Sequence, residues 1–160
     1  MNRRKVLIIS FLSIALIAFV FQGFLPETSM PHAEEEMTQQ EEVWNEDQLL
    51  EPAQLAATLN DPQRTAPVII DLGAGGAIKG SVEVGETRFK TGMDNLKKQV
   101  ENLPKDADIV IYCGCCPFEN CPNIRPAFGL LNDMAFENHK LLNLTRNIKV
   151  DWFDKGYPVN

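Results

Sequence analysis

The stretch "IVIYCGCCPFENCPNIRPAFGLL", residues 109–131, joins an apolar run, a cysteine-rich loop and a helical pattern. Its first four residues are apolar without alternation, which is typical of a strand buried on both faces of a sheet. After Arg125 the apolar residues return at helical spacing on one face: Ala127, Leu130, Leu131 and Met134. A buried strand followed by a loop and a helix indicates an α/β fold.

The same alternation of strands and helices continues on both sides of this stretch. We expect strands at residues 67–72, 106–113 and 139–144, helices at 49–61, 91–103 and 125–136, and a last helical turn ending at Gly156. Thr91 and Asp94 predict a capping box at the start of the second helix. Continuous apolar strands between helices predict right-handed crossovers and a parallel sheet covered on both faces. One α/β domain over residues 44–160 is therefore expected.

The N-terminal segment has a different composition. Residues 6–21 are apolar apart from two serines and follow the basic "NRRK", which is the layout of a secretory signal. With the following "GFL" the run reaches roughly the 20 residues that span a bilayer. A cleaved signal and a retained single-pass anchor over residues 1–26 both remain open. In either case we expect residues 27–43 to be an acidic spacer and the domain to be exported, in the periplasm or another extracytoplasmic space, with membrane contact only through the N-terminal segment.

The charge of the chain excludes some partners. The formal net charge is −7, and residues 27–160 carry 12 basic and 22 acidic side chains. Such a surface repels nucleic acid and anionic lipid headgroups. "GAGG" at residues 73–76 lacks the spacing of a nucleotide-binding glycine motif, so we interpret it as a flexible turn. The candidate chemistry is therefore that of the cysteines.

All four cysteines follow the strand at residues 106–113, at the edge of a parallel sheet where ligands bind. Cys113 leaves this strand and enters a loop that leads to a helix start, whose N–H groups favour an anion. A thiol placed there should ionise below its usual pKa of about 8.5 and become nucleophilic. Arg125 offers a planar donor for an oxyanion, or else it is a solvated arginine at the start of a helix.

The other three cysteines, Cys115, Cys116 and Cys121, admit different roles. Thiolates could hold zinc or copper, but this spacing differs from the separated pairs of structural zinc sites, and two adjacent cysteines would crowd one ion. We therefore predict no metal site. In an exported protein Cys115 or Cys116 could form a disulfide with Cys121, or one of the three could resolve a product formed on Cys113.

Successive segments of the chain resemble a single rhodanese-like domain, the fold of a sulfurtransferase family. The resemblance covers residues 48–160 and rests on "LLEPAQLAATL", "VIIDLG", "AIKGSVEV", "LPKDADIVIYC", "RPAFGLLNDMAF" and "DWFDKGYPV". It implies a central parallel sheet of about five strands with helices on both faces. It also implies that Cys113 carries transferred sulfur as a persulfide, that Arg125 closes the active-site loop and binds substrate, and that Asp71 supports the site.

The chain departs from the family pattern in three places. Between Cys113 and Arg125 lie 11 residues, more than in the loops of the family. Cys121 is closer to the family spacing, but we prefer Cys113 because the strand fixes its position. Ala77 stands where a histidine is common, and "TRNIK" replaces the usual glycines before the last helix.

These observations together predict a sulfurtransferase that needs no cofactor. Its partners would be small, namely thiosulfate or a persulfide as the sulfur donor and a thiol or cyanide as the acceptor. Two alternatives remain. One is an extracytoplasmic thiol–disulfide or metal-handling module that uses the cysteine-rich loop, and the other is a catalytically silent binding domain with the rhodanese fold.

Overall fold

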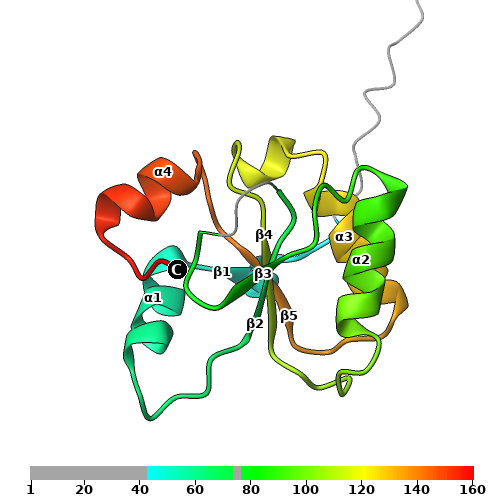
Figure 1. Ribbon diagram of the computed structural model, residues 1–160, viewed down its shortest axis with the longest axis horizontal. Helices are drawn as coiled ribbons and strands as arrows, with labels where there is room; N and C mark the ends of the chain where they lie inside the picture. The colour runs from blue at the N-terminus through cyan, green and yellow to red at the C-terminus, as the bar shows by residue number, and fades with distance from the viewer. Residues whose placement is uncertain (1–42, 74–76) are drawn as a thin grey trace, which may run out of the picture. The chain divides into compact units, whose positions relative to one another are not determined.

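The computed structural model describes residues 43–73 and 77–160. It contains a sheet of five parallel strands in the order β1-β5-β4-β2-β3 (Figure 1). The strands are β1 (Leu49–Leu50), β2 (Val68–Asp71), β3 (Ser81–Glu83), β4 (Ile109–Tyr112) and β5 (His139–Leu142). The predicted α/β fold with about five parallel strands is therefore confirmed.

Helices cover both faces of this sheet. They are α1 (Pro52–Asn60), α2 (Lys90–Val100), α3 (Ile124–Asp133) and α4 (Ile148–Asp151), with short 3-10 helices at Glu46–Gln48, Phe118–Asn120 and Phe153–Lys155. In Figure 1, α1 and α4 lie on one side of the sheet, and α2 and α3 lie on the other. Each strand–helix–strand connection thus returns to the same parallel sheet, as the alternating pattern predicts.

The central strand β4 contributes side chains to two apolar cores. Ile109 and Ile111 are buried with residues of α2 and α3, whereas Val110 and Tyr112 are buried with residues of α1 and with Trp152. Successive side chains of a strand point to opposite faces. Because both faces of β4 are covered, all four of its residues are buried, which explains the apolar run without alternation.

Some local predictions are wrong or incomplete. The second long helix begins at Lys90, and its N-cap residue Phe89 makes no side-chain cap bond. The predicted capping box of Thr91 and Asp94 is therefore wrong: Thr91 lies inside the helix, and Asp94 forms an ion pair with Lys90 at 2.6 Å. The strands β1 and β3 have two and three residues, too few for a hydrophobic pattern to predict from the sequence.

Two further predictions concern the N-terminal part of the chain. The signal or anchor at residues 1–26 and the spacer up to residue 42 lie outside the described residues. Among the described residues, no helix combines the length and the apolar character that a membrane crossing requires.

A close contact of α2 fixes the segment that follows β3. A β-carbon at Gly92 would clash with the carbonyl group of Glu86 and lie 2.9 Å from the backbone nitrogen of Thr87. The absence of a side chain at Gly92 thus lets residues 86–88 pack directly against the helix. On its other side, this segment is bound to Asn123, whose carbonyl oxygen accepts a hydrogen bond from the Thr87 hydroxyl at 2.5 Å.

We expect Gly92→Ala to lower the free energy of unfolding by about 1–3 kcal/mol, because the added methyl group meets backbone atoms that have no room to move. Gly129→Ala is the matched control: it also lies in a helix, but nothing lies within 4 Å of an added β-carbon. There the better helix propensity of alanine should raise the free energy of unfolding by up to about 1 kcal/mol. Urea unfolding of the full-length chain measures both, and equal effects would contradict this account of Gly92.

Candidate functional site

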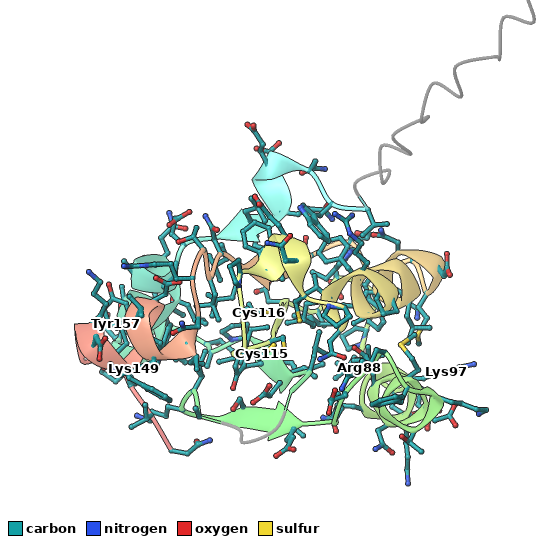
Figure 2. The ribbon with its side chains drawn as sticks, turned by 90° about the horizontal axis from the view of Figure 1, so that it is seen from above. Arg88, Lys97, Cys115, Cys116, Lys149 and Tyr157 are labelled. Carbon is teal, nitrogen blue, oxygen red and sulfur yellow. The ribbon has the colours of Figure 1, made fainter. Side chains whose placement is uncertain are left out.

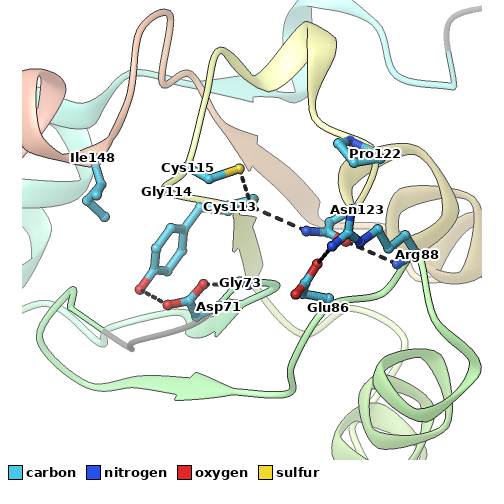
Figure 3. Close-up of a pocket in the computed structure, with 11 residues that line it drawn as sticks. Asp71, Gly73, Glu86, Arg88, Cys113, Gly114, Cys115, Pro122, Asn123 and Ile148 are labelled. Carbon is cyan, nitrogen blue, oxygen red and sulfur yellow. Dashed lines mark hydrogen bonds and ion pairs between the residues drawn. The ribbon is translucent and has the colours of Figure 1, made fainter.

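A pocket of about 480 Å³ opens at the carboxyl ends of β2 and β4 (Figure 3). This is the edge of a parallel sheet at which α/β proteins bind ligands. Its polar lining comes from Asp71, Glu86, Arg88, Tyr112, Cys113, Cys115 and Asn123. Of the residues predicted from the sequence, the structure brings Asp71, Cys113 and Cys115 to this pocket.

Cys113 is the first residue after β4 and is only 2 % exposed. The side-chain amide of Asn123 donates a hydrogen bond to its Sγ atom at 3.6 Å. A β-carbon at Gly73 would lie 3.4 Å from the same sulfur, so the backbone at Gly73 packs close to it. Cys113 thus lies at the wall of the pocket with hydrogen-bond donors around its sulfur.

These donors favour the ionised form of Cys113. Hydrogen bonds from the thiol of Cys121, and then from Asn123 and from the backbone and thiol of Cys115, lower the pKa of Cys113 to about 5, although burial raises it. Hydrogen bonds to a charged group stabilise the charge even where desolvation opposes it. The expectation from the sequence was a lowered pKa due to backbone N–H groups, whereas most of these donors are side chains.

The pKa values of two neighbouring thiols, Cys115 and Cys121, are shifted in the opposite direction. Burial, followed by hydrogen bonds with Cys116 and Cys113, raises the pKa of Cys115 to about 12. The hydrogen bond to Cys113 raises the pKa of Cys121 well above its usual range. At neutral pH Cys113 is therefore the thiolate of this group, and Cys115 and Cys121 keep their protons and donate them as hydrogen bonds.

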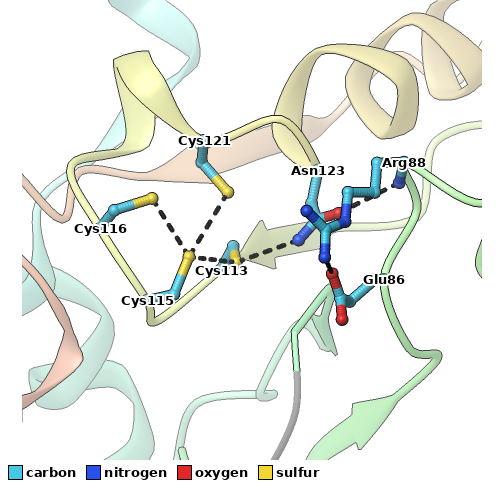
Figure 4. A network of polar contacts seen from close by, with 7 residues as sticks. All are labelled: Glu86, Arg88, Cys113, Cys115, Cys116, Cys121 and Asn123. Carbon is cyan, nitrogen blue, oxygen red and sulfur yellow. Dashed lines mark hydrogen bonds and ion pairs between the residues drawn. The ribbon is translucent and has the colours of Figure 1, made fainter.

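The sulfur atoms of all four cysteines lie close together (Figure 4). The Sγ of Cys115 is 3.4 Å from that of Cys113, 3.1 Å from that of Cys116 and 4.0 Å from that of Cys121. None of the four forms a disulfide in the structure. The predicted sulfur carrier and the predicted redox or disulfide residues therefore form one cluster.

Backbone hydrogen bonds fix the loop that carries these cysteines. The N–H of Ile148 donates to the carbonyl of Gly114 at 3.0 Å, and the N–H of Phe118 donates to the carbonyl of Leu144 at 3.1 Å. A β-carbon at Gly114 would lie 2.8 Å from the side chain of Ile148. The long loop is thus attached to the α4 side of the domain at two points.

Asp71 supports the site from the end of β2. Its Oδ1 accepts a hydrogen bond from the N–H of Gly73 at 2.8 Å, and its Oδ2 accepts one from the Tyr112 hydroxyl at 3.1 Å. Burial raises the pKa of Asp71, although these two hydrogen bonds lower it. Burial also raises the pKa of Tyr112 to about 12. The two groups thus hold the backbone at Gly73 in place beside Cys113. No pattern in the sequence indicates this role for Tyr112.

The structure does not bring Arg125 to the pocket. Arg125 lies in the first turn of α3, with its guanidinium 4.8 Å from the centre of the Trp44 ring. Its buried Nη1 has no hydrogen-bond partner among the described residues. The assignment of Arg125 as the anion partner remains a prediction, and its contact with Trp44 is a cation–π interaction.

Arg88 is the cationic side chain that lines the pocket in the described part of the chain. It lies just before α2 (Figure 2), is about half exposed and forms an ion pair with Glu86 at 2.5 Å. Its backbone N–H donates to the side-chain oxygen of Asn123 at 3.1 Å. No pattern in the sequence indicates that Glu86, Arg88 and Asn123 meet, because their meeting depends on the three-residue strand β3 and on the contact at Gly92.

Comparison with known proteins does not add to this description. No family model matches the chain, and no curated protein matches it significantly. The features of the site that bear on function are one buried thiolate, three neighbouring cysteines and a pocket with an arginine at its rim.

In the reduced full-length chain, we expect the rate of Cys113 alkylation by iodoacetamide to rise with pH through about 5 and to level off by about pH 7, because the thiolate is the nucleophile. Asn123→Ala should move this midpoint upward, since it removes a hydrogen bond to the thiolate. Trypsin leaves all four cysteines on one peptide, so tandem mass spectrometry must locate the label. Cys115 is the internal control, and its rate should still be rising at about pH 9. A Cys113 midpoint near that of an ordinary thiol would contradict the assignment.

Proposed function

We propose that this chain is a rhodanese-like sulfurtransferase domain that carries sulfane sulfur on Cys113. The observation that carries the proposal is a cysteine with a lowered pKa at the carboxyl end of the central strand, at the wall of an open pocket. A nucleophilic cysteine needs both a stabilised thiolate and access for its substrate. The resemblance of residues 48–160 to this family supports the same reading of the site.

The first half of the cycle loads the cysteine. The thiolate of Cys113 attacks the outer sulfur of thiosulfate, a new sulfur–sulfur bond forms, and the sulfur–sulfur bond of thiosulfate breaks. Sulfite leaves with the electron pair of that bond, and no proton has to move. The product is a persulfide anion on Cys113. The side-chain amide of Asn123 and the backbone N–H of Cys115, which donate to the thiolate, are suited to stabilising that anion as well.

The second half returns the cysteine to its initial state. An acceptor, either a thiolate or cyanide, attacks the outer sulfur of the persulfide, and the electron pair of the broken bond remains on Cys113 as a thiolate. Charge and atoms balance in both halves without an external oxidant or reductant. No cofactor is therefore needed for the proposed cycle.

Arg88 is the best-placed group for the sulfonate oxygens of thiosulfate. A guanidinium has five N–H donors, and the ion pair with Glu86 leaves some of them for a ligand. Glu86 would both hold the arginine at the rim and limit the affinity of the pocket for a dianion. We therefore assign substrate binding to Arg88 in the first place and keep Arg125 as the alternative that the family resemblance suggests.

Mass spectrometry of the full-length chain after reduction and incubation with thiosulfate tests the sulfur carrier. We expect the peptide with the four cysteines to gain the mass of one sulfur atom, and Cys113→Ser to abolish the gain. Cys116→Ser is the matched control, because the Cys116 sulfur contacts that of Cys115 at 3.1 Å and makes no hydrogen bond with Cys113.

Two outcomes would contradict this assignment. Uptake by Cys113→Ser together with none by Cys121→Ser would make Cys121 the carrier. An absence of uptake by the unmodified chain would favour the silent binding domain.

Substitution of the two arginines separates the candidates for the anion site. We expect Arg88→Ala to raise the KM for thiosulfate by about 10- to 100-fold, the equivalent of one lost hydrogen bond to a charged group. Glu86→Gln should lower the KM, because it frees the guanidinium. Arg125→Ala should leave the KM unchanged and lower the free energy of unfolding by about 0.5–1 kcal/mol through the lost contact with Trp44. The opposite pattern in KM would establish Arg125 as the substrate-binding residue. Steady-state transfer of sulfur to cyanide gives these constants.

A further inference from the structure

Sulfur transfer through Cys113 leaves the rest of the cysteine cluster unexplained. The Sγ atoms of Cys113, Cys115 and Cys121 all lie within 4.8 Å of one another, and Figure 4 shows the sulfurs of Cys115 and Cys121 pointing toward each other, with Cys113 beside that of Cys115. The sequence disfavours a metal ion held by both adjacent cysteines, but Cys116 lies outside this group of three. We propose that the three thiols bind a soft, thiolate-preferring metal ion, and that this ion is Cu(I). The proposal does not depend on sulfur transfer.

The distances between the sulfur atoms fit one shared ion. Three thiolates placed about 2.3 Å from a metal in a trigonal plane lie about 4 Å from one another, and in a tetrahedron about 3.8 Å. The Sγ of Cys115 is 3.4 Å from that of Cys113 and 4.0 Å from that of Cys121. The third separation, between the sulfurs of Cys113 and Cys121, is at most 4.8 Å, so all three are close to what one shared ion requires.

The type and number of the donors favour Cu(I). All three donors are sulfur, and the group includes no histidine and no carboxylate among the described residues. Soft thiolate ligands select Cu(I) and zinc over harder ions. Structural zinc sites are almost always four-coordinate. The fourth thiol would have to come from Cys116, whose Sγ is 3.1 Å from that of Cys115 but which does not belong to the group of three. A three-coordinate ion is the better fit.

The surroundings of the three thiols resemble those of a built metal site. Cys113 and Cys121 are each 2 % exposed and belong to the same buried apolar cluster as Phe118. Cys115 is exposed and offers a route for the ion from solvent. The side-chain amide of Asn123 donates to the Sγ of Cys113 at 3.6 Å, as groups around metal ligands commonly do to orient them.

The loop holds the thiols together before any ion binds. Cys121 follows the 3-10 helix Phe118–Asn120, and its N–H donates to the carbonyl of Phe118 at 3.2 Å. Gly114 and Phe118 are attached to the neighbouring loop, as described above. Much of the entropy cost of assembling three ligands is thus met by folding. Binding would release the remaining thiol protons to solvent.

Metal binding and sulfur loading would exclude each other. Both use the thiolate of Cys113. An ion held by the three thiolates would neutralise the charge of this sulfur and block the approach of thiosulfate, so it would prevent sulfur loading. Occupancy of the site would then switch the domain between a metal-bound and a sulfur-carrying form.

The test is an anaerobic titration of the reduced full-length chain with Cu(I) in the presence of bathocuproine disulfonate as a competing chelator. We expect one Cu(I) per chain, and X-ray absorption should show three sulfur neighbours. Cys113→Ser, Cys115→Ser and Cys121→Ser should each weaken binding by at least about 100-fold, because loss of a direct ligand exceeds the 10- to 100-fold effect of an outer partner. Cys116→Ser is the matched control and should bind as the unmodified chain does.

Three results would overturn the proposal. The first is the absence of Cu(I) binding by the unmodified chain, which needs no variant to fold. The second is unchanged binding by Cys113→Ser or Cys121→Ser. The third comes from a parallel titration with Zn(II): tighter binding of zinc, with four sulfur neighbours and a requirement for Cys116, would replace the three-thiolate copper site by a four-thiolate zinc site. Sulfur uptake is measured separately, so failure of one proposal leaves the other standing.

Discussion

The burial of β4 on both faces fixes Tyr112 and the residue that follows it, Cys113, at the centre of the candidate site. Its pairing with β2 places Tyr112 beside Asp71, and its apolar side chains hold it between two layers of helices. The residue that follows must leave the sheet at the edge where the parallel strands end. Cys113 is therefore held at the pocket by the same hydrophobic contacts that stabilise the domain, and its position does not depend on the conformation of the loop beyond it.

Most of the other groups of the site surround the buried thiolate of Cys113 and stabilise its negative charge. A thiolate in an apolar environment is costly unless donors surround it. Here the donors come from three directions: Asn123 at the start of α3, Cys121 before it, and Cys115 just after β4. Asn123 also binds the segment that carries Arg88, so the same side chain links the thiolate to the cation at the rim of the pocket.

The sequence predicts the features that depend on one element and misses those that depend on several. The apolar runs of β2, β4 and β5 are sufficient for the α/β fold, and they place Cys113 and Asp71 at the ends of their strands. The contact between Arg88 and Asn123 cannot be predicted in this way, because it depends on the short strand β3 and on the packing of residues 86–88 against α2 at Gly92. The wrong capping box has a similar origin, because residue types at the right spacing do not ensure the geometry of a cap.

The long loop after β4 supplies thiols as hydrogen-bond donors to the Cys113 thiolate, and thiols, unlike backbone N–H groups, are chemically reactive. In a short loop after a strand, backbone N–H groups can surround an anion, and they are inert to metals and oxidants. With 11 residues between Cys113 and Arg125, two of the groups that stabilise the Cys113 thiolate are instead the thiols of Cys115 and Cys121. Thiols are themselves metal ligands and targets of oxidation. The same thiols that stabilise the thiolate of Cys113 can therefore also change its reactivity, when they bind a metal or are oxidised. Backbone N–H groups around the thiolate would not have this effect.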